Sequence, residues 1–211
     1  MNKFHLLLLV IVSSYFVIGV YSYPLLPESM ASHWNFKGQV DGYMPKFWGV
    51  FLLPFTAVGL SLLFMVIPRI DPLKSNIERF RKYYAGYVLL FQAFLFYLYI
   101  LTILWNFGVN FRLIQLLTPA IGVVFYFIGV LLGKVKRNWF IGIRTPWTMS
   151  NNVVWDKTHK LGGKLFKIAG LIPFLGVLME NLAVFLILIP LLIVSIYLIV
   201  YSYVEYKKIE K

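Results

Sequence analysis

The chain contains no cysteine. A disulfide framework, a thiolate metal site and a thiol nucleophile are therefore excluded. The sequence also lacks a phosphate-binding G-x-x-x-x-G-K-[ST] loop, a zinc-binding H-E-x-x-H helix and a G-x-S-x-G nucleophile elbow. We therefore expect no catalytic residue, no metal site and no cofactor, and a protein that is not an enzyme.

Charge is scarce as well. Only 13% of the 211 residues are charged and 60% are hydrophobic, whereas about a quarter of a soluble protein is charged. The chain cannot cover itself with a polar surface, so lipid must be the solvent for much of it. Acidic residues are the rarer sign, with 8 against 20 basic residues and a net charge of +12. In a soluble protein this excess would suggest a nucleic-acid partner, so the positions of the charges decide its meaning.

Six apolar stretches are long enough to cross a bilayer as helices. The fifth is the weakest, because Lys164 and Lys167 lie in its first turns and Pro173 lies inside it. Ionisable side chains are otherwise almost absent from the stretches, and we expect Gln92, the clearest polar group, to bond a neighbouring helix. The sequence predicts an all-α integral membrane protein with about six transmembrane helices, over residues 4–21, 47–67, 84–105, 114–132, 161–179 and 182–203.

The basic residues set the orientation. With the N-terminus inside, only Lys37, Lys46 and Arg112 of the 20 basic residues lie outside, and the other 17 lie inside. This asymmetry follows the positive-inside rule and favours six spans with both ends in the cytoplasm. It also explains the net charge without direct nucleic-acid binding, and it indicates a multi-pass protein of the cell membrane with membrane lipids as its surroundings.

The chain is predicted to form a single membrane domain over residues 1–211. Its N-terminal part, residues 1–67, is a two-span unit with an outer loop at 23–46. Its C-terminal part, residues 112–203, holds a cytoplasmic loop at 133–163. We expect the first span to be retained, because its end does not form a small-residue A-x-A cleavage site.

The outer loop is rich in turn signals. Lys37-Gly38 and Asp41-Gly42 favour tight reversals, because glycine accepts positive φ and aspartate bonds its own backbone. The loop is therefore predicted to be compact and to form a recognition surface at the outer membrane face. Its aromatic anchors would be Trp34, Phe36 and Tyr43.

A metal site in this loop is the weaker alternative. His33, Asp41 and Glu28 are its only metal-binding side-chain types. One histidine with two carboxylates at no characteristic spacing is a weak pattern.

The second inner loop is predicted to form a cytoplasmic helix that runs into the third span. Asp71 would be its N-cap and Pro72 its first residue. One face would hold Leu73, Ile77, Phe80 and Tyr84. An entry helix at an anionic leaflet is its simplest role.

The loop at 133–163 is the longest polar segment. Ser150 is predicted to cap an interfacial amphipathic helix that leads into the fifth span. Arg144 precedes a rigid Pro146-Trp147 corner, where it would clamp a lipid phosphate, cap carbonyls or dock a cytoplasmic partner. One face of the helix would be formed by Val154, Trp155, Thr158 and Leu161.

Taken together, the loops resemble the SdpI family of membrane proteins and the domain of unknown function at its N-terminus. The outer loop is similar to L-P-x-x-[IM]-x-x-H-[WF]-x-x-x-G-x-x-D-G, with Ala31 as a departure where a proline is expected. The second loop carries the pattern P-x-I-D-P at residues 68–72. The long loop is similar to N-[WY]-x-x-G-I-R-T-P-W-T followed by W-x-x-T-H-x-x-[GA]-G, at residues 138–148 and 155–163.

The resemblance implies a multi-span helical protein without a cofactor. It also implies immunity to a secreted, membrane-active peptide toxin outside the cell and signalling to a transcriptional repressor inside it. The outer recognition residues would be His33, Trp34, Asn35, Gly38, Asp41 and Gly42. The inner partner residues would be Asn138, Arg144, Thr145, Pro146, Trp147, Trp155 and His159.

Two other functions remain open at the level of sequence. One is a small membrane transporter or lipid-handling protein, although proton-coupled transport usually needs carboxylates within the spans. The other is a membrane enzyme that uses His33, Asp41 or His159. The predicted topology places the two histidines on opposite sides of the membrane, so they would not share a site.

Overall fold

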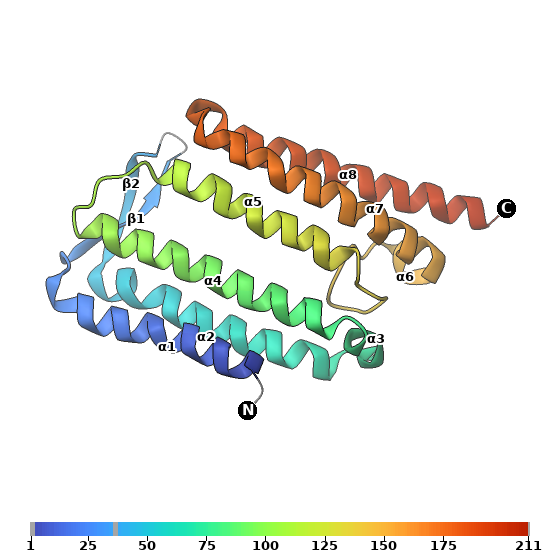
Figure 1. Cartoon of the computed structure of the whole chain (residues 1–211), viewed down its shortest axis with the longest axis horizontal. Coiled ribbons are helices and arrows are strands. Elements are labelled where there is room, and N and C mark those ends of the chain that lie inside the picture. The colour runs from blue at the N-terminus through green and yellow to red at the C-terminus, as the bar shows by residue number, and fades with distance from the viewer. Residues whose placement is uncertain (1–2, 36–37, 211) are drawn as a thin grey trace. The chain divides into compact units, whose positions relative to one another are not determined.

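The computed structural model describes residues 3–35 and 38–210. It is helical throughout except for one short β-hairpin, which confirms the predicted class of an all-α membrane protein. In chain order the elements are α1 Lys3–Ser22, η1 Tyr23–Leu25, β1 Ser29–Trp34, β2 Val40–Pro45, α2 Lys46–Ile70, α3 Lys74–Glu78, α4 Arg81–Asn106, α5 Leu113–Leu132, α6 Pro146–Ser150, α7 Asn152–Leu171, η2 Ile172–Val177, η3 Glu180–Leu182 and α8 Ala183–Ile209 (Figure 1).

Contacts between residues divide the chain into two compact units. Unit 1 comprises residues 1–64 and 88–117, and unit 2 comprises residues 65–87 and 118–211. The single-domain prediction and its subdivisions stay predictions.

Within the described residues, five helices are long and apolar enough to cross a membrane: α1 continued by η1, α2, α4, α5 and α8. The chain is therefore a multi-pass membrane protein. The predicted fifth span, 161–179, falls on α7 and η2 and is not one of the five. Its lysines make α7 much less apolar than its neighbours, so a sixth crossing stays a prediction.

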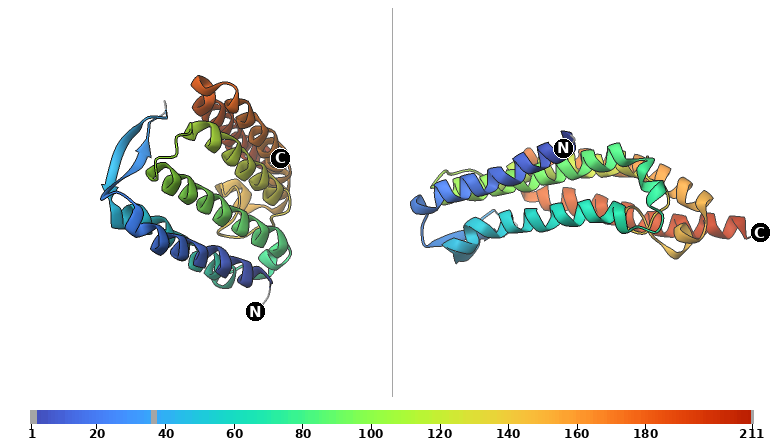
Figure 2. Two further views of the ribbon diagram at one scale, coloured as in Figure 1. Left: turned by 60° about the vertical axis from the view of Figure 1, so that its left-hand side comes forward. Right: turned by 90° about the horizontal axis from the view of Figure 1, so that it is seen from below.

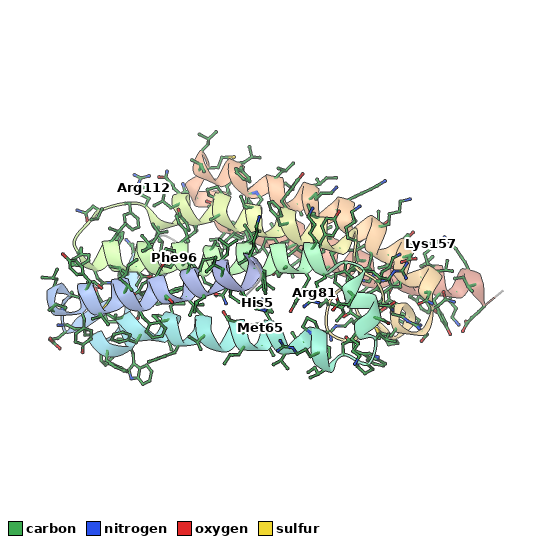
Figure 3. The ribbon with its side chains drawn as sticks, turned by 60° about the horizontal axis from the view of Figure 1, so that its bottom comes forward. His5, Met65, Arg81, Phe96, Arg112 and Lys157 are labelled. Carbon is green, nitrogen blue, oxygen red and sulfur yellow. The ribbon has the colours of Figure 1, made fainter. Side chains whose placement is uncertain are left out.

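Unit 1 packs α1, α2 and α4 around aromatic side chains. Tyr15 and Tyr99 are fully buried with ring centroids 5.1 Å apart, and Phe96, marked in Figure 3, packs edge-on to Tyr15 at 4.9 Å. Gln92 of α4 donates to the Ala57 carbonyl at 3.0 Å and to Ser61 at 2.8 Å, both on α2. The prediction that Gln92 bonds a neighbouring helix is confirmed.

In unit 2, α7 lies against α5 through glycines. A Cβ on Gly129 of α5 would lie 2.8 Å from the Gly163 carbonyl of α7, and one on Gly122 would lie 2.6 Å from the Gly170 carbonyl. Only glycine permits backbones to approach this closely. On its other side α7 runs beside α8, the orange and red helices of Figure 1.

Candidate functional site

The β-hairpin of unit 1, residues 29–45, is the first candidate surface. Figure 2 (left) shows it at the end of α1 and α2. Its strands pair antiparallel, with Ala31 opposite Tyr43 and His33 opposite Gly42, and the register is irregular between these pairs. The sequence predicted a compact loop but not strands.

Asn106, the last residue of α4, fixes the hairpin in place. Its Oδ1 accepts from the Ala31 amide at 2.8 Å, and its Nδ2 donates to the Ala31 carbonyl at 3.1 Å. The side-chain amide thus pairs with β1 as a neighbouring strand would. Alanine at position 31 has a reason here, because a proline would lack the N–H that Asn106 accepts.

The lower face of the hairpin is packed on helices. Met30 is fully buried, and a Cβ on Gly49 of α2 would lie 2.7 Å from its sulfur. Trp34 packs edge-on against Trp105 of α4, with ring centroids 5.8 Å apart. Buried Lys46 pairs with exposed Glu28 at 2.7 Å, so an outer basic residue serves the base of the hairpin.

The upper face of the hairpin carries exposed polar groups. His33 Nδ1 lies 2.5 Å from Asp41 Oδ1, and a Cβ on Gly42 would lie 2.8 Å from the His33 Cβ. Gly42 therefore leaves the room in which His33 stands beside Asp41. Tyr43 is exposed on the same strand.

Two turn predictions for this loop had different outcomes. Gly38 has a φ of +75°, so the reversal there is confirmed, and the turn is closed by the Asn35 amide donating to the Gln39 carbonyl at 2.9 Å. The prediction of a turn at Asp41-Gly42 is wrong, because both residues lie within β2. They pair with β1 instead of reversing the chain. Phe36 lies outside the described residues.

The second candidate surface belongs to unit 2. We call it the loop cluster and define it as residues 71–80 and 133–152. Fully buried Asn138 organises it. Its Nδ2 donates to the carbonyls of Lys136 and Ile141, and its Oδ1 accepts from the amides of Phe140 and Ile141. One side chain thereby replaces the regular structure that this segment lacks.

Asp71 joins the two loops of the cluster. It is buried, and its carboxylate accepts from the Leu73 amide at 2.6 Å and the Trp139 amide at 2.8 Å. The prediction that Asp71 caps a helix beginning at Pro72 is wrong. Helix α3 begins at Lys74, and the residue before it, Leu73, makes no side-chain cap. The carboxylate is used across the loop cluster as well as locally.

A second capping prediction is also wrong. Ser150 ends α6, and the cap of α7 is Asn151, whose Oδ1 accepts from the amides of Val153 and Val154. The predicted amphipathic helix itself is present, with Val154, Trp155 and Thr158 buried on one face.

His159 is buried in the same face. Its Nε2 accepts from the Ile143 amide at 2.8 Å, and its Nδ1 bonds the Trp155 carbonyl at 2.8 Å. The ring stacks on Trp155 at 3.9 Å. Burial lowers the pKa of His159 to about 4, and both hydrogen bonds suit a neutral ring that carries its proton on Nδ1.

Gly142 is required beside this ring. Its φ is +120°, and a Cβ there would lie 2.5 Å from His159 Nε2. The G-I-R-T-P-W segment thus passes directly over the histidine.

The threonine-proline corner is bound to α8. Thr145 and Thr148 form a reciprocal capping box at the start of α6, and Thr145 Oγ1 lies 2.9 Å from Ser202 Oγ of α8. Trp147 contacts the ring of Tyr203 at 5.0 Å. Lys157 of α7, labelled in Figure 3, pairs with Glu205 of α8 at 2.7 Å.

Arg144 remains at the surface. Its Nη1 donates to the Trp139 carbonyl at 2.5 Å, which is the carbonyl-capping role among those predicted. Trp139 and Phe140 beside it are exposed, as is Pro146. The seven predicted inner residues thus lie together, but Asn138, Thr145, Trp155 and His159 are buried. These four shape the surface that Arg144 and the exposed aromatics present.

Neither surface is equipped for catalysis by acids, bases or metals. Within residues 3–35 and 38–210 no three His, Cys, Asp or Glu side chains lie close enough to hold a metal ion. The buried histidine has both ring nitrogens engaged. Both surfaces suit binding.

Comparison with known proteins supports both halves of the resemblance. Residues 134–202 match the SdpI/YfhL protein family, and residues 6–58 match a domain of unknown function, DUF1648. The chain is 25% identical to the immunity protein SdpI of Bacillus subtilis (strain 168) over 213 residues, which covers 98% of each chain. No solved structure matches.

Proposed function

We propose, for a chain whose C-terminal region is that of the SdpI/YfhL family, that it acts in immunity to a membrane-active peptide toxin in the cell membrane. The observation that carries this proposal is the alignment with the immunity protein SdpI over 98% of both chains. Because the hairpin, the spans and the loop cluster all fall inside that alignment, the similarity extends to both candidate surfaces.

The hairpin supports a recognition role. Asn106 and the contacts of Met30 hold its lower face on the helices. Its upper face presents His33, Asp41 and Tyr43 to the surroundings. A fixed backbone with exposed polar and aromatic groups binds with little loss of conformational entropy. We assign the toxin to this face.

The loop cluster supports a second contact, with a cytoplasmic regulator. Its backbone is held by Asn138, Asp71 and His159. Exposed Arg144, Trp139 and Phe140 stand on this frame. Arginine and aromatic side chains are the types that dominate protein interfaces.

Survival of cells that express the chain tests the proposal. Expression should raise tolerance to a membrane-active peptide encoded in the chain's own genomic neighbourhood. Gly42→Ala should lower that tolerance, because the new methyl group displaces His33. Gly59→Ala is the matched control, because a Cβ there has no neighbour within 4 Å. Unchanged tolerance on expression, with altered uptake of a small solute on deletion, would support a transporter instead.

A further inference from the structure

The loop cluster contains a small polar pocket beside the start of α7. It has a volume of about 240 Å³. The residues that matter for its charge and shape are Asn76, Arg79, Lys136, Arg137, Asn152 and Asp156. All of them belong to unit 2.

The charges of the pocket do not balance. Three cations line it against one carboxylate, and that carboxylate, Asp156, is paired with Lys136 at 3.1 Å. Arg79 has no ion pair in the part of the chain that the structure describes. Arg137 donates through Nη1 to the Met149 carbonyl at 3.2 Å. That carbonyl orients the guanidinium without neutralising it.

Helix α7 adds to the positive potential. It begins at Asn152 and runs for 20 residues. The first amides of a helix have no carbonyl one turn earlier, and the helix dipole makes this end positive. Asn151 satisfies the amides of Val153 and Val154, while Asn152 lies in the pocket wall.

The pocket is also held in shape. Asn76 Nδ2 donates to the Arg137 carbonyl at 2.8 Å, so the two loops meet at its wall. Trp155, which is buried, donates from Nε1 to the Val135 carbonyl at 3.2 Å and closes another side. An anion entering the pocket would meet positioned donors, which lowers the entropic cost of binding.

We propose that this pocket binds a phosphate group. Two guanidinium groups and a helix N-terminus are the donors that suit tetrahedral oxyanions, because the planar fork of arginine matches two phosphate oxygens. The excess positive charge excludes a metal cation. The volume suits a phosphate with a small alcohol attached, which is the headgroup of phosphatidylglycerol. This site is independent of the immunity proposal.

The primary test measures lipid binding by the purified, full-length protein. Phosphatidylglycerol is titrated in detergent, and native mass spectrometry counts the retained lipids, with phosphatidylcholine as the zwitterionic reference. Arg79→Gln should weaken phosphatidylglycerol retention by about threefold to tenfold, since a basic side chain near a lipid phosphate contributes about that factor. Arg81→Gln is the matched control. Arg81 lies two residues further on, at the start of α4 (Figure 3), is paired with Glu78 at 2.9 Å, and does not line the pocket.

A second variant has the opposite expected effect. Asp156→Asn removes the one carboxylate and releases Lys136, so retention of phosphatidylglycerol should rise by about the same factor. A purely structural role of the pocket would not produce an increase. Thermal melting of each variant checks that the fold is intact.

Competition with inorganic phosphate identifies the source of the group. Displacement of the lipid by millimolar phosphate, sensitive to Arg79→Gln, assigns the pocket to phosphate in general. Resistance to phosphate with the same sensitivity assigns it to the lipid headgroup. Equal losses for Arg79→Gln and Arg81→Gln would mean diffuse surface attraction and overturn the proposal. Binding of a glutamate-rich peptide, with neither phosphate nor phosphatidylglycerol bound, would overturn it in favour of an acidic protein partner.

Discussion

Single amide side chains hold both candidate surfaces together. Asn106 bonds both backbone groups of Ala31, and Asn138 bonds three residues of its own loop and one before it. Asn138 stood out in sequence because it begins a long signature. Asn106 did not, since an asparagine at the end of an apolar helix looks like an ordinary helix terminus. Its partner is 75 residues away along the chain, so no local pattern contains the interaction.

Removal of the Asn106 clamp should loosen the hairpin. Asn106→Ala leaves an amide and a carbonyl of Ala31 without partners, at a cost of about 1–3 kcal/mol. Asn106→Asp keeps an acceptor for the Ala31 amide and loses the donor, so its effect should be smaller. Hydrogen exchange of the β1 amides measures the difference. Equal exchange in all three proteins would show that the contacts of Met30 and Trp34 suffice.

His159 should make stability depend on pH. Its folded pKa, about 4, lies below the ordinary value of about 6.5, so the unfolded chain binds the proton more tightly. Stability is complete above pH 6.5 and is lost as the pH falls toward 4, by on the order of 3 kcal/mol. Thermal melting followed by tryptophan fluorescence reports the loss.

Replacement of the histidine tests this assignment. His159→Gln retains a side-chain acceptor for the Ile143 amide but does not titrate. It should be less stable at pH 7 and should melt at nearly the same temperature across pH 4–6.5. A pH dependence as steep as that of the parent protein would locate the effect at another group.

At the scale of elements, helices were predictable and strands were not. Apolar runs about 20 residues long identified five spans to within a few residues, because bilayer thickness sets their length. The strands of the hairpin lack regular alternation. Met30 and Ala31 are adjacent and both buried, and the register breaks between Ala31 and His33. An irregular strand of six residues hides the period on which a strand prediction depends.

Helix α7 is the element for which composition and packing disagree. Its lysines keep it outside the set of clearly apolar helices, yet glycine contacts run from Gly163 to Gly176 along α5. A Cβ on Gly176 would lie 2.8 Å from Thr118, near the start of α5. If α5 crosses the membrane, the segment beside it crosses as well. Packing therefore supports the sixth span.

Cysteine labelling decides the number of crossings, because the chain has no cysteine of its own. With six spans, cysteines at Gln39 and at Leu178, which is 84% exposed, should react with an impermeant thiol reagent in intact cells. Cysteines at Asn151 and Lys207 should react only after lysis. Labelling of Lys207 from outside, with Leu178 protected, would establish five crossings. Labelling of Asn151 from outside would reverse the proposed orientation.

At the scale of the whole molecule, the proposed function separates two outputs. The hairpin belongs to unit 1 and the loop cluster to unit 2. The predicted charge asymmetry assigns them to the outer and inner faces. The sequence indicated both surfaces through the family signatures. It did not indicate that four of the inner signature residues are buried, because tertiary burial of polar side chains such as His159 and Asn138 depends on partners from other segments.

Substitutions on the two surfaces should therefore have different effects. Replacing Asp41 and Gly42 together by alanine should reduce toxin tolerance, since the His33 pair is lost and its space filled. Arg144→Lys should preserve tolerance and abolish the transcriptional response, because lysine keeps the charge but cannot form the planar contacts of a guanidinium. Survival assays and a reporter for the regulator measure the outputs, and membrane fractionation checks insertion. Loss of both outputs in both variants would contradict the division.

Biosynthesis must follow the same glycine contacts. During synthesis, α5 is finished before α7 emerges, so its glycine face is available when the more polar helix arrives. Helix α7 is a poor candidate for leaving the translocation channel into lipid alone. Helix α8, with a mean hydropathy of 3.1, follows directly and is well suited to enter the bilayer with α7 as a helical hairpin. A nascent chain stopped after Met179 should accordingly keep its last segment at the cytoplasmic surface until the residues of α8 are added.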